Sequence, residues 1–337
     1  MICKQKNLKF VWLAMLLILA GTFFGSLFGG RYFISPGEVG KILIAGLLGG
    51  EQDSIAASVV WNLRLPRTLL NALVGAGLAV AGASFQGVFK NPLVSPDVLG
   101  VSSGAAFGAA FGILLSGVNQ LATVLALVFG ILSVFMTYTL SKLRGESSTL
   151  SLVLSGMIIS AVFSALISLI KYVADPYDKL PAITYWLMGS FANSSYSNLK
   201  LVGVPILLGI VVLLLLRWRI NILSLGDEEA YSLGVNPVRT RLVIIVMATF
   251  ITAACVTVTG VIGWVGLVIP HICRMLVGED HKSLLPAACI VGAIFMIIVD
   301  MIARTATAAE IPIGILTALV GAPFFAILFK TSKGAWQ

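Results

Sequence analysis

Residues Arg217–Arg241 read RWRINILSLGDEEAYSLGVNPVRTR, a charged segment between two long apolar stretches. Seven of its 25 residues are charged, whereas charged residues make up 11% of the whole chain. Because both flanks are apolar, we expect the segment to lie at a membrane surface. Acidic residues favour the first turn of a helix and glycine favours its end, so Asp227–Glu229 and Gly234 predict a short helix here.

The function of this short helix has two interpretations. A structured helix at a membrane surface is typical of a contact site for a soluble partner. A run of charges is also the usual composition of a solvated connector. The residues alone leave both interpretations open for the segment 221–239.

The composition indicates an integral membrane protein. The chain has 337 residues, is 58% hydrophobic and has a mean hydropathy of +1.03, whereas soluble domains are about 25% charged. We predict an all-α polytopic protein, with residues 1–337 forming a single transmembrane domain. Stretches long enough to cross the bilayer, about 20 apolar residues each, give about ten spans: 10–30, 62–85, 97–116, 120–141, 149–173, 197–217, 240–262, 264–277, 284–303 and 312–330.

The distribution of basic residues predicts the orientation. An even number of spans places both termini on one side, and the loops of that side hold 14 of the 22 Lys and Arg residues. Positive loops face the cytoplasm, so we expect both termini to be cytoplasmic. The first apolar run has no small-residue cleavage site after it, which predicts a retained helix and not a signal peptide.

No catalytic motif is present in the sequence. It lacks the phosphate loop, the H-E-x-x-H zinc motif and the G-x-S-x-G nucleophile motif, and it has two histidines and four cysteines without C-x-x-C spacing. We therefore predict no catalytic residue, metal site or cofactor in this chain. Asp300 is the main acid expected at membrane depth, and Arg304, four residues later, can pair with it on one helix face.

Two predicted helices are interrupted. Residues 86–97 contain two prolines, and Asp97 is suited to cap the next helix. Residues 260–271 combine glycines with Pro270. Interruptions at corresponding places in the two halves predict inverted repeats, as in many transporters, although a plain turn is an alternative for residues 86–97.

Several motifs together resemble those of the FecCD family, the permease subunits of ABC importers for iron-siderophores, haem and vitamin B12. The resemblance runs from about Arg64 to Phe329. Five motifs are single stretches: RLPRTL at 64–69, QGVFKNPLVSPDVLG at 86–100, YWLMG at 185–189, GLVIPH at 266–271 and DMIAR at 300–304. Two more are segments defined by their ends: 225–234, which begins and ends with LG, and 310–324, which begins with EIPIG and ends with GAPF.

The resemblance implies an assembly in the inner (plasma) membrane of a prokaryote. It implies ten helices per subunit, a homodimer with the transport path at its axis, and two ABC ATPase subunits that bind ATP and Mg. A periplasmic or lipid-anchored solute-binding protein would deliver the substrate, and no nucleic acid is expected as a partner. The residues that would contact the ATPase are Leu225, Gly226, Asp227, Glu228, Glu229, Ala230, Leu233 and Gly234. Leu225 and Leu233 would share a helix face with Ala230 or Glu229.

The resemblance also implies roles for residues at both membrane surfaces. Arg64, Arg67 and Arg304 would dock the binding protein, while pairing with Asp300 or snorkelling is their alternative role. A cytoplasmic gate would consist of small polar and apolar residues, and simple N-capping is an alternative for two of them, Ser148 and Thr149. The gate residues are Asn91, Leu93, Ser147, Ser148 and Thr149.

The sequence leaves two classes of function. The first is the permease of an ATP-driven importer, with an iron-siderophore expected as substrate ahead of haem, cobalamin, molybdate or tungstate. The second is a stand-alone, ion-coupled carrier, which normally needs several buried acids. A single acid near a helix end supports that second class poorly.

Overall fold

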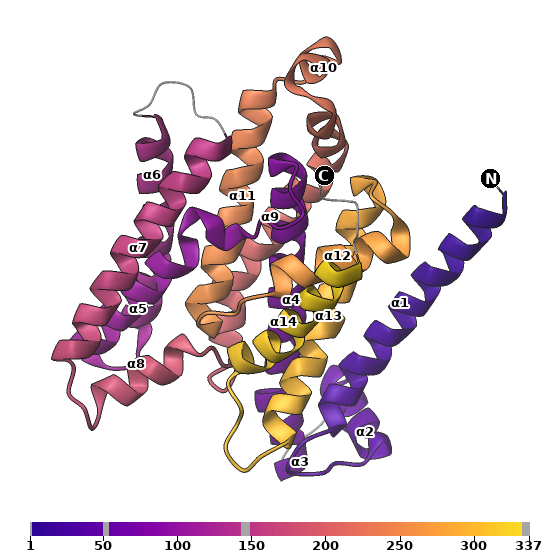
Figure 1. Ribbon diagram of the computed structural model, residues 1–337. Coiled ribbons are helices and arrows are strands. Elements are labelled where there is room, and N and C mark those ends of the chain that lie inside the picture. Colours follow the sequence, from indigo (N-terminus) through magenta and orange to yellow (C-terminus); the bar gives the residue numbers. More distant parts are fainter. Residues whose placement is uncertain (1, 50–53, 143–148, 332–337) are drawn as a thin grey trace.

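The computed structural model describes residues 2–49, 54–142 and 149–331 of the chain (Figure 1). Within these ranges every regular element is helical. The helices are α1 (Ile2–Phe28), α2 (Pro36–Leu47), α3 (Ile55–Ser58), a π-helical turn (Val59–Arg64), α4 (Leu65–Phe89), a 3-10 turn (Pro96–Leu99), α5 (Val101–Ser116), α6 (Gln120–Lys142), α7 (Thr149–Val173), α8 (Lys179–Leu187), α9 (Tyr196–Leu225), α10 (Asp227–Ser232), α11 (Pro237–Thr259), α12 (Val265–Val277), α13 (His281–Thr305) and α14 (Ile313–Thr331).

The predicted all-helical membrane fold is confirmed, since each predicted span contains a helix. Among the described residues, seven helical segments are long and apolar enough to cross a membrane, and α5, α12 and α14 are shorter apolar helices. The count of ten spans therefore stays a prediction, as does the inverted repeat. The predicted span 197–217 was too short, because α9 continues to Leu225. Helices α2 and α8 were not predicted, because hydropathy detects only segments of membrane-spanning length.

Helix α4 lies at the centre of the molecule, and all its residues from Val74 to Phe89 are buried. Its glycines allow other backbones to approach closely. A Cβ atom added at Gly75 would overlap the backbone of Gly292 in α13, and one added at Gly82 would overlap Gly266 in α12. Close packing through small residues is a common way for helices to associate in lipid, and here it places α12 and α13 directly against α4.

The first predicted interruption is confirmed, but its geometry differs from the prediction. Helix α4 ends where Lys90 adopts a left-handed conformation, with φ of 50°. Asp97 does not cap α5, as was predicted; it lies inside the 3-10 turn that Pro96 begins, and its carboxylate accepts a hydrogen bond from the Ser102 hydroxyl. Helix α5 begins only after Gly100, whose φ is 82°.

The second predicted interruption is also present, between α11 and α12. Gly260 has φ of 71°, and α12 begins after Trp264, which also has φ of 71°. Neighbouring segments provide backbone hydrogen bonds at this junction. Ser190 N donates to Thr259 O (2.7 Å), Ile313 N to Gly189 O (2.9 Å) and Gly314 N to Met188 O (3.0 Å). Irregular backbone at membrane depth requires such partners.

The helices place the candidate sites at opposite ends of the molecule (Figure 1). Helix α10, the start of α1 and the facing ends of α6 and α7 lie at one end, which we call the α10 end. Helices α2, α3 and α8 and the connection between α13 and α14 lie at the other, which we call the α8 end.

The contact between α4 and α13 gives a first prediction. Replacing Gly75 with Ala places a methyl group against the Gly292 backbone, and overpacking of this kind typically destabilises a protein by about 1–3 kcal/mol. We expect a clear fall in the melting temperature of the purified protein. Gly21→Ala in α1, where an added Cβ meets nothing within 4 Å, is the matched control and should leave stability unchanged or slightly higher. Equal effects of the two substitutions would contradict the packing argument.

Candidate functional site

At the α10 end, the charged segment forms the short helix that the sequence predicts. Asp227, Glu228 and Glu229 occupy the first turn of α10. The helix ends in a Schellman motif, because Gly234 has φ of 76° and its N–H donates to Tyr231 O (3.0 Å), while Val235 N donates to Ala230 O (2.9 Å). The predicted glycine at the end of the helix is thus confirmed.

The exposed surface of this segment is both apolar and acidic. Leu225 and Leu233 are exposed, but Leu225 is the last residue of α9 and not part of α10. Of the two residues expected to share their face, Glu229 is exposed and Ala230 is fully buried. Ala230 therefore packs inward, and an exposed leucine lies at the end of each of the two helices α9 and α10.

Polar contacts fix α10 to its neighbours. Arg241 Nη2 lies 2.9 Å from Asp227 Oδ1, which ties the first turn of α10 to the first turns of α11. Asn236 caps α11 by accepting a hydrogen bond from Arg239 N (3.0 Å). The position of α10 is consequently set by α9 and α11 together.

A second polar link joins the end of α9 to the start of α13. Asn221 Nδ2 donates to Asp280 Oδ1 (2.5 Å), and Asn221 Oδ1 accepts from His281 N (2.9 Å) and contacts His281 Nδ1 (2.8 Å). Arg217 Nη1 also donates to Lys282 O (3.2 Å). Sequence reasoning missed this link; the available signal was Asp280 directly before an apolar helix, which is typical of an N-cap.

The predicted gate residues lie partly outside the described structure. Asn91 and Leu93 form an exposed turn after α4, in which Asn91 Oδ1 accepts a hydrogen bond from Leu93 N (2.9 Å). Ser147 and Ser148 lie outside the described residues, and Thr149 is the first residue of α7. The 3-10 turn that follows Leu93 packs against α7 where Gly156 leaves space for Val98. A gate at this place stays a prediction.

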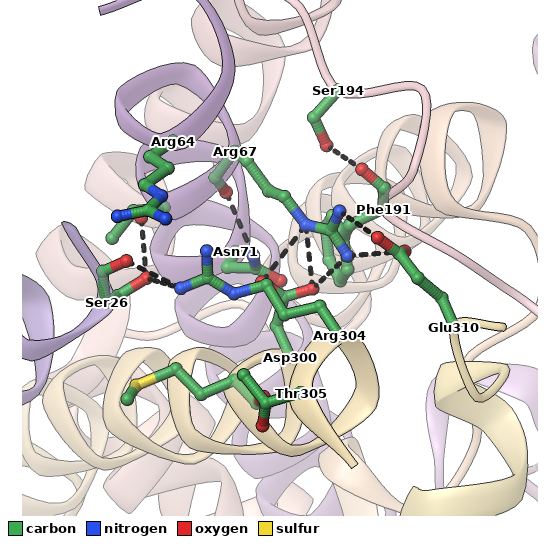
Figure 2. A network of polar contacts seen from close by, with 12 residues as sticks. Ser26, Arg64, Arg67, Asn71, Phe191, Ser194, Asp300, Arg304, Thr305 and Glu310 are labelled. Carbon is green, nitrogen blue, oxygen red and sulfur yellow. Dashed lines mark hydrogen bonds and ion pairs between the residues drawn. The ribbon is translucent and has the colours of Figure 1, made fainter. Parts of the chain in front are cut away.

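At the α8 end, Arg67 joins two acids from distant parts of the chain (Figure 2). Its Nη2 lies 2.8 Å from both Asp300 Oδ1 and Glu310 Oε2, and its Nη1 donates to Glu310 Oε1 (2.9 Å). Arg304 Nε lies 3.6 Å from Asp300 Oδ2, which confirms the predicted pair on one face of α13. Glu310 was not predicted as a partner.

The other two predicted docking arginines are buried, with Arg64 5% and Arg304 7% exposed. Arg64 donates to Leu27 O (2.7 Å) and to Tyr32 O, and Arg304 Nη2 donates to Ser26 O (2.6 Å) and Ser26 Oγ (2.9 Å). The alternative role, pairing with Asp300, is seen for Arg67 and Arg304, whereas Arg64 donates to backbone carbonyls instead. Their docking to a binding protein stays a prediction.

The α8-end cluster, which consists of Arg64, Arg67, Arg304, Asp300 and Glu310, carries one more positive than negative formal charge. A cavity of about 250 Å³ opens beside it, and Arg31, Arg64, Arg67, Arg304 and Glu310 are among its lining residues. The hydrogen bonds from Arg67 lower the pKa of Glu310, which lies in the connection between α13 and α14. A cationic cavity of this kind can receive a carboxylate.

Comparison with known proteins identifies the family. The model of the FecCD transport family matches residues 16–331. The chain belongs to the FecCD transport family. The molybdate import system permease protein MolB of Haemophilus influenzae is 44% identical, covering 96% of this chain and 95% of its own length. An iron chelatin transport system permease protein of Helicobacter pylori is 42% identical, covering 84% and 86%.

A solved structure supports the same assignment for this FecCD member. An ABC transporter described as of the metal-chelate type, in an inward-facing conformation, has a TM-score of 0.85 and 42% identity, covering 96% of this chain and 99% of its own. The chain is thus a multi-pass permease subunit of an ABC importer in the inner membrane, with ATPase and substrate-binding partners. The relatives do not support the alternative hypothesis of a stand-alone, ion-coupled carrier.

The contact between Arg67 and Glu310 predicts a pH dependence of stability in this FecCD member. Folding lowers the pKa of Glu310, so its ion pair with Arg67 stabilises the folded state at pH 7, which is above the ordinary glutamate pKa of about 4.3. This stabilisation is lost as the pH falls through the pKa that Glu310 has in the folded protein. We expect Glu310→Gln to destabilise the protein by about 1 kcal/mol at pH 7, as for a partly exposed pair, and by much less near pH 3. Thermal unfolding at both pH values measures this, with exposed Glu38→Gln as control. A penalty that is the same at both pH values would contradict the assignment.

Proposed function

We propose that this chain forms a homodimeric permease that imports a metal chelate, driven by two separate ABC ATPase subunits that bind ATP and Mg. A periplasmic or lipid-anchored binding protein delivers the substrate to the α8 end. The α10 end faces the cytoplasm, and both termini are cytoplasmic. The excess of Lys and Arg in the loops of that side supports this orientation.

The observation that carries the proposal is the structure of the segment 221–239. Helix α10 is capped, tied to α11 by the Asp227–Arg241 ion pair, and flanked by the exposed side chains of Leu225 and Leu233. A passive connector needs none of these features. Apolar anchors contribute most of the energy of an interface, and rim charges tune its rate and specificity. The segment therefore has the properties of a docking helix for the ATPase, through which hydrolysis is coupled to transport.

Two exposed apolar faces are available for contacts between the two copies of the proposed homodimer. Helix α7 exposes Met157 and Ile158, and α14 exposes Leu319 and Val320. In the proposed dimer these two helices line the path at the axis. The gate residues at the start of α7 and in the turn after α4 then close the path on the cytoplasmic side.

Docking of the binding protein is proposed at the α8-end cluster. Arg67 is the most accessible of its three arginines, with 12% of its side chain exposed, and its partner Glu310 is 26% exposed. A carboxylate of the binding protein can therefore reach Arg67 by replacing Glu310, the more exposed of its two acidic partners. Arg64 and Arg304 would contribute through the positive potential of the cavity.

An iron chelate is proposed as the substrate. The Helicobacter pylori relative is named for iron chelatin, and the similar solved structure is of the metal-chelate type. Molybdate is the second candidate, because the relative with 44% identity is a molybdate permease and matches 96% of this chain.

The substrate is tested by identifying what the cognate binding protein carries. Iron in the purified protein, measured by mass spectrometry of the metals, together with ATP-dependent uptake of a ferric chelate into proteoliposomes, supports the proposal. Molybdenum in the binding protein, with uptake of molybdate, would replace iron by the second candidate.

The docking role of α10 gives a prediction for Leu233. Replacing Leu233 with Asp puts a charge into the proposed apolar anchor, so the ATPase should no longer co-purify or should hydrolyse ATP without uptake. The permease should still insert and dimerise. Tyr177→Asp, at a highly exposed site in the connection between α7 and α8, should leave ATPase co-purification intact. Normal co-purification and uptake in Leu233→Asp would refute the assignment of the docking helix.

The gate gives a prediction for Asn91. In a cysteine-free background, Asn91→Cys should crosslink to its copy across the dimer in one nucleotide state and separate in another. Val211→Cys, exposed on the surface of α9, is the control and should not change with the nucleotide state. Crosslinking that is absent, or equal in every state, would exclude a gate at this position.

A further inference from the structure

A groove unrelated to either proposed site runs along the outer surface of the helices. It lies between α1, α4, α9 and α13, with a volume of about 570 Å³. Its lining is almost entirely apolar and includes Leu69, Leu73, Gly203, Val204 and Leu207. Because these four helices are candidate membrane spans, the groove faces the hydrocarbon of the bilayer.

The length of the groove matches one leaflet. Along α9 it extends from Leu199 to Ile210, which is about 16 Å at 1.5 Å per residue. The hydrocarbon core is about 30 Å thick, so one leaflet contributes about 15 Å. Since α9 begins at the α8 end, the groove covers the half of the membrane nearest that end.

Gly203 forms part of the wall of the groove and leaves the space above its backbone open. A Cβ atom added at Gly203 would meet only Leu73 Cδ2, at 3.9 Å. Val204, which is 70% exposed, and Leu207 stand beside it as a rim. The space over the Gly203 backbone, between these side chains, is a slot that can receive a hydrocarbon chain.

One charged residue lies at the end of the groove. Lys200, the fifth residue of α9, is exposed and lines the groove. No ion pair found among the described residues uses it. A lysine at this level extends to the membrane interface, where its ammonium group attracts anionic lipid headgroups.

We propose that this groove binds an anionic phospholipid, with one acyl chain along Gly203 and the phosphate group beside Lys200. The apolar lining, the length of one leaflet and the single cation at the interface together specify this ligand. A second copy of the chain would bury the same apolar surface but would leave Lys200 without an anionic partner.

The test compares lipid retention and stabilisation in purified protein. Native mass spectrometry counts bound lipids, and melting temperatures are measured after adding phosphatidylglycerol or phosphatidylcholine. Wild type should retain phosphatidylglycerol and be stabilised more by it than by phosphatidylcholine. Lys200→Gln should lower the preference for phosphatidylglycerol about fivefold, the effect of one basic residue at an anionic surface.

Gly203 provides a matched pair of variants. Gly203→Leu fills the slot and should abolish retention of both lipids at this site, while Gly203→Ala adds a methyl group at ordinary contact distance and should retain them. Equal retention by the two variants, or an unchanged lipid preference in Lys200→Gln, would overturn the proposal. If the wild type binds no lipid and Gly203→Leu no longer forms dimers, the groove would instead be the contact surface for a second copy of the chain. If Gly203→Leu fails to fold, the lipid preference of wild type and Lys200→Gln still decides the question.

Discussion

The close approach of backbones around α4 is the constraint on which the rest of the structure depends. Gly75 and Gly82 let α13 and α12 lie directly against α4, and in lipid such packing replaces the hydrophobic force that drives soluble proteins to fold. Helix α4 carries Arg67 near one end and leads into the Asn91 turn at the other. The glycine contacts therefore set the position of the α8-end cluster and of the proposed gate at the same time.

The breaks in the helices follow from the rule that backbone polar groups at membrane depth need partners. At the break after α11, Thr259 O accepts from Ser190 N, and the adjoining Gly189 O accepts from Ile313 N. The backbone polar groups of three separate segments, at Thr259, at 189–190 and at Ile313, thus form hydrogen bonds with each other where the regular helix ends. The positive φ of Trp264 is uncommon for a bulky residue, and its side chain packs closely against Gly321 and Phe325 of α14.

The sequence predicted features whose cause is local. Long apolar runs identified the helices, Gly234 identified the end of α10, and the spacing of Asp300 and Arg304 identified their pair. Burial of Arg64 and the partnership of Arg67 with Glu310 were not predictable, because Arg67 and Glu310 are 243 residues apart in the chain. Spacing along one helix is set by its geometry, whereas contacts between helices depend on how the whole bundle packs.

The same packing gives the molecule a direct connection between its ends. Helix α13 contacts Asn221 through Asp280 and His281 at the α10 end, and carries Asp300 and Arg304 at the α8 end. Its 25 residues extend about 37 Å, and Gly292 fixes its middle to α4. Two distant sites can be coupled through a structural element that adopts either of two discrete conformations. Helices α4 and α13 are tightly packed against each other. A conformational change therefore costs the least free energy at the helix breaks 90–100 and 260–264, where α-helical hydrogen bonds are already absent. In the proposed function, motion of α10 would reach α13 through the adjoining α9, whose Asn221 holds the start of α13.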